Sequence, residues 1–403
     1  MNKRVILISL LFSTYFLTGC WDRYELEERA NILGLAIDVM DEEAENFTVP
    51  EITYKEENIP DEYKEPIIKL TAQLAVPGKI KLGPEGGGGG DGSEKTAWVV
   101  QTVGSSLKDA MTNLQQQLAE KLYLGHLQII VLNEKVAKRG TEDINDFLKR
   151  EYEVRRTAWM VVSEDKAEEV LQAAPPIETV PALYLSDTLK NSMRFGKLPR
   201  EHLGRFWLDI EDIGIGGSIP YITVIENDRI MVSGLAYFKG DKMVGHMTPF
   251  EIGVYLAMQG KNPGGYAIAV NTDDGGIYIG ESSVRRSDIK INVKDGQPSA
   301  QLNVEVEVTI EEETKANDLD NKKVKKIEKE MEKSAVEKFE KTINKWKENE
   351  SDVLGIGART RAEFPHYWDE QVKTDENWSQ IFKEMNIEVN VECQIERAGM
   401  EWK

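Results

Sequence analysis

The segment LQIIVL, residues 127–132, contains five apolar side chains and a single amide. A continuous apolar run of this kind is typical of a central strand that is covered on both faces of its sheet. Strand and helix patterns alternate around it, which predicts one α/β domain with a mixed sheet. The predicted strands are residues 31–40, 47–54, 67–76, 96–103 and 158–162, and the predicted helices are residues 105–118, 141–150 and 165–171.

A glycine-rich segment, residues 78–95, interrupts this pattern with five consecutive glycines at positions 86–90. A phosphate-binding loop needs a Lys-Ser/Thr pair that opens a helix, but Asp91 and Gly92 stand in that place. We predict a flexible loop instead, because such a sequence buries too little apolar surface to offset the entropy of ordering it.

A second glycine-rich segment, residues 212–221, precedes sequence of β type. Its GIGG motif, residues 214–217, suggests a dinucleotide-binding fingerprint. That fingerprint opens a helix, whereas Pro220 and the ITVI sequence after it favour a strand. Residues 229–247 then predict a β-hairpin that turns around Gly240.

The longest predicted helix, residues 318–347, carries an apolar stripe opposite a face of Lys and Glu. We expect this stripe to pack on a sheet of its own domain, and the alternative is a partner-binding surface. Residues 387–395 alternate as a final strand. The remaining predicted elements are a helix over residues 248–258 and strands near Ala267, Tyr278, Ile289 and residues 302–310.

Together these patterns predict an α+β multidomain protein. It has an N-terminal α/β domain with a mixed sheet, a hairpin-containing middle region, and a C-terminal domain with a long helix packed on an antiparallel sheet. The predicted divisions are residues 1–19 for a signal peptide, 20–195 for the N-terminal domain, 196–260 for the middle region and 261–403 for the C-terminal domain.

The N-terminus has the pattern of a bacterial lipoprotein signal. Lys3 and Arg4 precede an apolar run at residues 5–17, which is shorter than the roughly 20 apolar residues of a spanning helix. The run ends in LTGC, residues 17–20, the Leu, small, small, Cys order of a lipobox. We predict that Cys20 carries an S-diacylglyceryl group and an N-acyl chain such as palmitate, which tether the mature protein to a membrane. The alternative is an ordinary secretory signal with a chance cysteine.

The chain is strongly acidic, with a formal net charge of −20 at pH 7. Removing the signal takes away Lys3 and Arg4, and −20 less two positive charges leaves −22. Phosphate backbones repel such a surface, so nucleic acid is not an expected partner. Cys393 is the only cysteine besides Cys20, so no intramolecular disulfide is expected once Cys20 carries lipid.

No catalytic, cofactor-binding or metal-binding constellation emerges from the sequence. The four histidines, at positions 126, 202, 246 and 366, are scattered, and there is no HExxH, CxxC or G-x-S-x-G motif. Cys393 lies in an alternating strand, and we expect a small buried residue there rather than a nucleophile. The sequence therefore predicts neither enzyme activity nor a cofactor nor a metal.

Several blocks along the chain resemble the Ger(x)C family of spore germination lipoproteins, the C subunits of nutrient germinant receptors. The resemblance begins at CWDR, residues 20–23, and ends at IERAG, residues 395–399, so it spans nearly the whole mature chain. The glycine run departs from the family pattern and resembles an inserted loop. The blocks in between are KLYLGH at 121–126, DFL at 146–148, IETVPA at 177–182, GLAYFKGDKMVG at 234–245, GIG at 355–357, and Pro365, Trp368 and Trp378.

This resemblance implies a non-enzymatic subunit held by its lipid on the outer face of the spore inner membrane. Such a subunit assembles with two integral membrane subunits, A and B, and is required for nutrient-triggered germination. The resemblance also implies a multidomain α+β fold, a germination-lipoprotein domain over residues 20–195, and a family C-terminal region at about residues 220–400. It does not identify the nutrient or the subunit that contacts it.

Two other protein classes share the anchor and the size. An extracytoplasmic solute-binding lipoprotein would need a preformed cleft between domains with convergent polar groups. An extracytoplasmic enzyme would need clustered titratable groups of perturbed pKa.

Replacing Cys20 by alanine tests the anchor. Without the thiol, no thioether to diacylglycerol can form, and we expect the variant either to leave the membrane fraction or to keep its signal peptide. Fractionation and intact-mass measurement distinguish these two results. A Cys393→Ala variant is the matched control and should stay on the membrane. A Cys20→Ala protein that is cleaved at the same bond and remains firmly membrane-bound would contradict the assignment.

Overall fold

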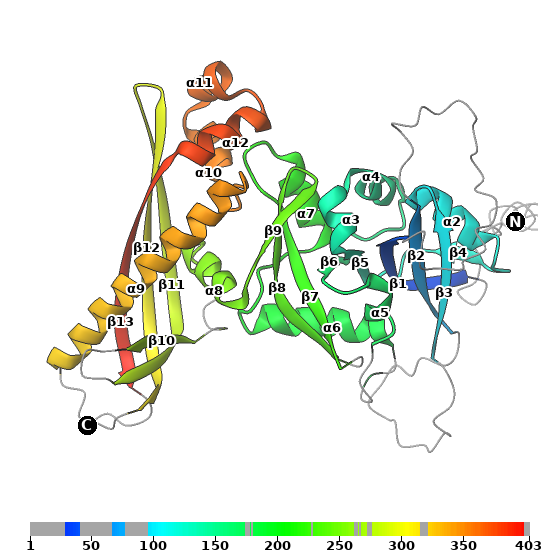
Figure 1. The fold of residues 1–403 in the computed structure, drawn as a ribbon, viewed down its shortest axis with the longest axis horizontal. Helices are drawn as coiled ribbons and strands as arrows, with labels where there is room; N and C mark the ends of the chain where they lie inside the picture. Colours follow the sequence, from blue (N-terminus) through cyan, green and yellow to red (C-terminus); the bar gives the residue numbers. More distant parts are fainter. Residues whose placement is uncertain are drawn as a thin grey trace, which may run out of the picture.

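The structure of the chain is a computed structural model. It describes residues 29–40, 67–76, 96–173, 178, 180–226, 229–261, 265, 267–271, 276–314 and 321–398. The predicted strand at 47–54 and the glycine-rich segment at 78–95 lie outside the described residues. Two β-sheets, of nine and four strands, lie side by side along the long axis of the molecule, with helix α8 (Pro249–Met258) between them (Figure 1).

The nine-stranded sheet is mixed, as predicted. Its strands are β1 (Arg29–Val39), β2 (Ile68–Ala75), β3 (Ala97–Gly104), β4 (Lys121–Tyr123), β5 (Ile129–Asn133), β6 (Trp159–Ser163), β7 (Ser218–Ile225), β8 (Arg229–Lys239) and β9 (Lys242–Met247). The order is β3-β2-β1-β5-β6-β7-β8-β9, with β4 beside β1. The central strands β1, β5, β6 and β7 run parallel, and antiparallel pairs flank them on both sides. The predicted hairpin at 229–247 is confirmed as β8 and β9.

Both faces of this sheet carry helices, because its central strands are apolar on both sides. In β5, Ile130 and Leu132 point into one hydrophobic cluster, and Ile129 and Val131 point into the other. All four are fully buried, so the prediction of a strand covered on both faces is confirmed. One layer comprises α2 (Leu107–Gln115), α3 (Glu134–Arg139), α4 (Glu142–Arg150) and α7 (Leu203–Glu211), and the other comprises α5 (Ala167–Val170) and α6 (Pro181–Arg194).

Helix α2 is shorter than the predicted range of residues 105–118. It begins after Ser106, whose hydroxyl accepts a hydrogen bond from the backbone N–H of Asp109 at 3.2 Å. Ser105 donates its backbone N–H and its hydroxyl to the Asp109 carboxylate, at 2.9 and 3.2 Å. The two serines and Asp109 thus satisfy groups that a helix start leaves without partners. Helix α7 was not among the predicted elements.

The four-stranded sheet is built on one long hairpin. β11 (Ile277–Lys294) and β12 (Gln297–Glu313) pair antiparallel and turn at Asp295 and Gly296, whose φ angles are 53° and 75°. Positive φ at both central residues is the geometry that suits a two-residue hairpin turn. β10 (Ile268–Asn271) pairs with β11, and β13 (Asn386–Ala398) pairs with β12. The strands predicted separately near Tyr278 and Ile289 are one continuous strand.

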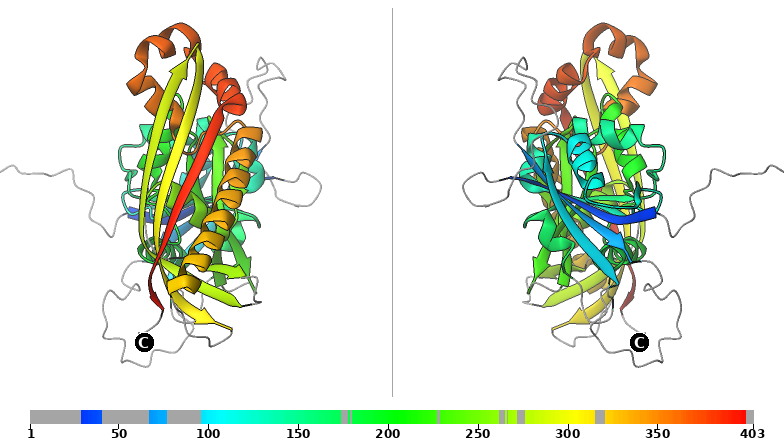
Figure 2. Two further views of the ribbon diagram at one scale, coloured as in Figure 1. Left: turned by 90° about the vertical axis from the view of Figure 1, so that its left-hand side faces the viewer. Right: turned by 90° about the vertical axis from the view of Figure 1, so that its right-hand side faces the viewer.

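The last strand differs from the predicted antiparallel sheet, because β13 runs parallel to β12. A parallel neighbour needs a crossover connection, and helices supply it here. Figure 2 shows the first of them, α9, lying along the sheet beside β13. The crossover elements are α9 (Asn321–Glu348), α10 (Ile356–Glu363), α11 (Pro365–Tyr367), the π-helical turn η3 (Trp368–Val372) and α12 (Asp375–Glu384).

The apolar stripe of α9 packs on this sheet, as predicted, so the alternative of an exposed partner-binding stripe is wrong. Two glutamates of the same helix, Glu328 and Glu332, accept the backbone N–H groups of Ile395 and Cys393 at 2.9 and 3.2 Å. Because β13 is an edge strand, α9 also covers donors that would otherwise pair with another strand. No helix in the described part of the chain is both long and apolar enough to cross a membrane. The buried stripe residues include Ile327, Met331, Phe339, Ile343 and Trp346.

Helix α8 connects the two sheets. Thr248 and Glu251 form a capping box at its start, which confirms the helix predicted at 248–258. Tyr255 and Leu256 are buried in a hydrophobic cluster that includes residues of both sheets. Lys345 of α9 donates to Glu251 at 2.9 Å, which ties α8 to the second sheet.

A carboxylic acid is buried where the residues before α7 meet α8. Glu201 is only 8% exposed, and its Oε2 has no hydrogen-bond partner within the described structure. Burial and the nearby charge of Asp209 raise the pKa of Glu201 to about 8, against the opposing charges of Arg205 and Lys261. In the folded state Glu201 therefore carries a proton at neutral pH, which avoids the cost of a buried charge.

Glu201→Gln should change how stability depends on pH. The folded-state pKa of about 8 lies above the ordinary value of 4.5, so the folded protein keeps a proton that the unfolded chain releases. Wild-type stability therefore falls as the pH rises toward 8. The glutamine variant lacks this group. Its free energy of unfolding, relative to that of the wild type, should therefore rise by about 2–3 kcal/mol when the pH is raised from roughly 6 to 9.

Chemical denaturation of the wild type and of Glu201→Gln, at roughly pH 6 and at roughly pH 9, measures this gain. Glu211→Gln, at an exposed position of α7, is the control and should show none. Identical pH dependence of the wild type and Glu201→Gln would contradict the buried acid.

Candidate functional site

Cys20, the one predicted site residue, lies outside the described residues, and its lipidation stays a prediction. Within the described part, two glycine motifs that are far apart in the sequence come together. The loop before β7, with residues 214–217, touches the start of α10, with residues 355–357. We call this contact the interdomain joint, and define it by Gly214, Gly216, Asp352, Gly357 and Trp378.

Asp352 is the centre of the joint. Its Oδ2 accepts the backbone N–H of Gly357 at 2.7 Å and the indole N–H of Trp378 at 3.0 Å, while Oδ1 accepts the N–H of Ile356 at 3.1 Å. Two of these donors open α10, so the carboxylate also meets the positive end of the helix dipole. Burial raises the pKa of Asp352 to about 6, and the three hydrogen bonds oppose the rise. The group is therefore ionised at neutral pH.

The glycines allow two stretches of backbone to touch. The N–H of Ala358 donates to the carbonyl of Gly214 at 3.1 Å, and the N–H of Gly216 donates to the carbonyl of Asp352 at 2.8 Å. A Cβ on Gly214 would lie 2.8 Å from the carbonyl carbon of Gly357 and 2.9 Å from the backbone nitrogen of Ala358. Since a side chain has no room there, the GIGG motif serves packing. It leads into strand β7 rather than a helix, so a dinucleotide fingerprint is excluded.

Two tryptophans complete the joint from the C-terminal side. Trp368 and Trp378 are 4% and 1% exposed, and their ring centroids lie 5.3 Å apart. Phe382 continues the aromatic cluster, 6.5 Å from Trp378. Both tryptophans that the sequence analysis singled out are therefore buried packing residues.

Ion pairs surround the joint at the surface. Arg361 binds Asp212 at 2.5 Å, and Glu350 binds Lys239 and Lys383 at 2.5 and 2.9 Å. Hydrogen bonds from Lys239 and Lys383 lower the pKa of Glu350 to about 2. All these side chains are partly exposed, and exposed pairs contribute only about 0–1 kcal/mol each. The buried contacts of Asp352 and the aromatic cluster therefore hold the joint together.

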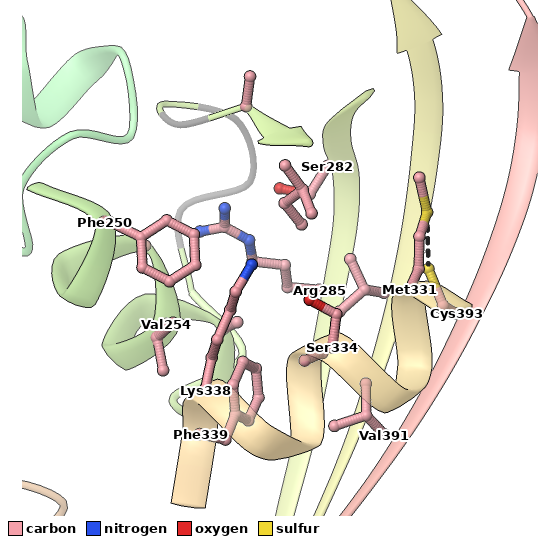
Figure 3. A pocket seen from close by; sticks show the side chains of 16 residues that line it. Phe250, Val254, Ser282, Arg285, Met331, Ser334, Lys338, Phe339, Val391 and Cys393 are labelled. Atoms are coloured by element: carbon pink, nitrogen blue, oxygen red, sulfur yellow. Dashed lines mark hydrogen bonds between the residues drawn. The ribbon is translucent and has the colours of Figure 1, made fainter. Parts of the chain in front are cut away.

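A cavity of about 50 Å³ lies between α8, α9 and the four-stranded sheet (Figure 3). Most of its lining is apolar, and two cationic side chains, Arg285 of β11 and Lys338 of α9, extend toward Phe250. The Nζ of Lys338 lies 4.7 Å from the centroid of the Phe250 ring. The cavity thus combines positive charge with hydrocarbon walls.

Cys393 also lines this cavity, and its sulfur lies 3.8 Å from the sulfur of Met331. Burial, with smaller effects from the charges of Glu332 and Glu328, raises the pKa of the thiol to about 12. Only the thiolate is a good nucleophile or metal ligand. Cys393 is therefore a buried packing residue at neutral pH, as predicted.

The histidines lie in separate environments. The rings of His126, His202 and His246 pack against different aromatic residues, at centroid distances of 5.7, 4.4 and 4.4 Å. In the ranges that the structure describes, no group of three or more His, Cys, Asp or Glu side chains could hold a metal ion.

The sequence did not single out Asp352, Arg285 or Lys338. For Asp352 no local signal exists, because it lies three residues before Gly355 at the start of α10, whereas a typical capping side chain belongs to the residue directly at the helix start. Arg285 and Lys338 have no local signal either, since the cavity that they line forms only when β11 packs against α8 and α9.

Trp378→Phe should destabilise the protein more than Trp368→Phe. Both changes remove a similar volume from one aromatic cluster, but only Trp378 donates its indole N–H to Asp352. The expected difference is about 1.5–3 kcal/mol in the free energy of unfolding, the usual contribution of a hydrogen bond to a charged group. Denaturant titration of both variants measures it. Equal losses would show that the Asp352 contact does not stabilise the joint.

Comparison with protein families accounts for both parts of the chain. Residues 22–224 match the family described as "Spore germination protein N-terminal domain". Residues 233–399 match the family described as "Spore germination B3/ GerAC like, C-terminal". The interdomain joint therefore brings together residues from both matched regions.

Individual relatives align over most of the chain. Spore germination protein KC of Bacillus subtilis (strain 168) is 24% identical over 99% of this chain and 97% of its own length. Spore germination protein GerQC of Bacillus cereus is 24% identical over 78% of this chain and 85% of its own length. The crystal structure of the GerBC protein shares the fold, with a TM-score of 0.54 at 17% identity over 90% of this chain and 97% of that one. The chain belongs to the Ger(x)C family of spore germination proteins.

Proposed function

We propose that this chain is a lipid-anchored, non-enzymatic subunit of a spore germinant receptor, required for nutrient-triggered germination. Family membership across both parts of the chain is the observation that carries the proposal. Relatives that align nearly end to end, such as spore germination protein B3 of Bacillus subtilis (strain 168), are named as germination proteins. The proposed role is to hold receptor subunits together through protein contacts rather than to turn over a substrate.

The anchor in this proposal is Cys20, supported by the LTGC lipobox at residues 17–20. A single acyl chain binds membranes only marginally, at about 0.8 kcal/mol per buried CH₂, whereas two or more chains give stable attachment. The protein would then lie on the outer face of the spore inner membrane, with its folded part outside the bilayer. Its proposed partners are the two integral membrane subunits, A and B.

The buried polar groups of the described part support a role without turnover. Asp352 directs both carboxylate oxygens to donors inside the protein, and the thiol of Cys393 is buried and protonated. A general base or nucleophile must instead be within reach of a substrate. These groups stabilise the fold and leave the outer surface for partner contacts.

The alternative of a solute-binding lipoprotein fits the described structure less well. Such a protein binds its ligand in a cleft between domains, with a volume of about 300–1,000 Å³. Here α8 and the joint fill the space between the two sheets, and the cavity beside α9 measures about 50 Å³. A larger hollow of about 570 Å³ is open at the surface, and it is lined by Glu251 and by one face of α9 rather than by two domains.

Affinity purification of the tagged, full-length protein from spore membranes tests the assembly. We expect two integral membrane proteins to co-purify with the wild type in a constant ratio. Their recovery should fall for Cys20→Ala, because loss of the anchor lowers the effective concentration of the partners. An unrelated tagged lipoprotein of the same membrane is the control. Recovery of the wild type alone, in a mild detergent that keeps other membrane complexes intact, would contradict the proposal.

A further inference from the structure

The cavity beside α9 is positively charged within a strongly acidic protein. Its lining includes Arg285 and Lys338 and, among the described residues, no Asp or Glu, although the chain carries a net charge of −20. Arg285 is only 8% exposed, and burial lowers the pKa of its guanidinium to about 10, against the opposing charge of Glu281, which lies outside the lining. It therefore remains protonated at neutral pH. This lining attracts an anion in a protein whose average surface repels one.

The rest of the lining is almost entirely hydrocarbon. Phe250 of α8 and Phe339 of α9 supply aromatic walls, and Met331 lies on the side away from Phe250 (Figure 3). Ser282 and Ser334 are the only neutral polar side chains in the described lining. A ligand with many hydroxyl groups would leave most of them without hydrogen bonds here, at a high desolvation cost. The lining suits a molecule with one anionic end and an apolar remainder.

The size of the cavity sets the length of that remainder. One water molecule needs roughly 10–15 Å³ of such volume, and the cavity offers about 50 Å³. A few heavy atoms fit, which is less than a sugar ring or a peptide occupies. Guanidinium groups pair well with carboxylates because two parallel N–H···O bonds can form.

We propose that this cavity binds a short-chain organic carboxylate. The carboxylate lies between Arg285 and Lys338, and the alkyl chain lies against Phe339 and Met331. Because the walls come from α8, α9 and the sheet, and α8 also packs on β8 of the other sheet, the ligand adds contacts where the two sheets connect. This binding goes beyond the receptor role and does not depend on it, since the purified chain contains the whole site.

Butyrate binding to the purified full-length protein in a non-ionic detergent tests the proposal, with saturation-transfer NMR and titration as readouts. Butyramide has the same shape without the charge and should bind at least about tenfold more weakly, since it loses charge-assisted hydrogen bonds. Equal affinity for butyrate and butyramide, or no binding of butyrate, overturns the proposal. Micelles without protein correct for uptake of either probe by the detergent.

Three variants locate the binding site. Arg285→Met and Lys338→Met each remove one cation and keep an unbranched apolar side chain, and each should weaken butyrate binding at least about tenfold. Lys341→Met, on the same helix but outside the cavity lining, is the matched control and should leave affinity unchanged. If Arg285→Met fails to fold, as judged by its melting curve, Lys338→Met decides. An equal loss from Lys341→Met and Lys338→Met would assign the effect to surface charge and overturn the site.

Ala335→Leu provides a test that leaves every charge in place. Ala335 lines the cavity on α9, and a larger side chain there fills the space that the alkyl chain needs. The variant should stay folded and lose butyrate binding. A folded Ala335→Leu protein with unchanged affinity would place the carboxylate elsewhere and overturn the proposal.

Discussion

The buried carboxylate of Asp352 fixes the position of the last part of the chain. A buried charge is tolerated only when its hydrogen bonds are made, so the start of α10 and the indole of Trp378 must both be in place around it. The carbonyl of the same residue accepts from Gly216, which belongs to the loop before β7. One residue therefore fixes the loop before β7, the start of α10 and the indole of Trp378 relative to one another. The exposed ion pairs nearby could shift by an ångström without comparable cost.

Helix α9 extends this constraint from the joint to the far end of the second sheet. Near its C-terminus, Trp346 packs edge-to-face on Tyr255 of α8, and Lys345 binds Glu251. Further toward its N-terminus, Glu332 and Glu328 accept N–H groups of β13. The same helix thus buries a sheet face, covers a sheet edge and ends beside Asp352. The helix is rich in Lys and Glu, yet it is held in one position, because side chains of its polar face form hydrogen bonds with α8 and β13 while its apolar face packs on the sheet.

Local patterns predicted most of the elements, whereas contacts between distant segments could not be predicted. The alternation at 387–395 identifies a strand, but side chains alternate in the same way in parallel and antiparallel strands, so the direction of β13 depends on the crossover. Gly214 and Gly357 are visible as glycines, yet nothing local shows that they touch. Asp352 is one of 70 acidic residues, and only the contacts that it makes in the folded protein distinguish it. Cys20 is the opposite case, since a lipobox is recognised in an unfolded segment and needs no fold.

The two sheets share one hydrophobic cluster, and this limits how they can move. Leu235 of β8, Tyr255 of α8 and Leu302 of β12 all belong to it. Separating the sheets would expose the apolar side chains of this cluster, at a cost of about 25 cal/mol per Å² of exposed surface. The shared cluster therefore opposes separation of the two sheets. For a subunit proposed to act by assembly, this means that a partner bound to one sheet also determines the position of the other.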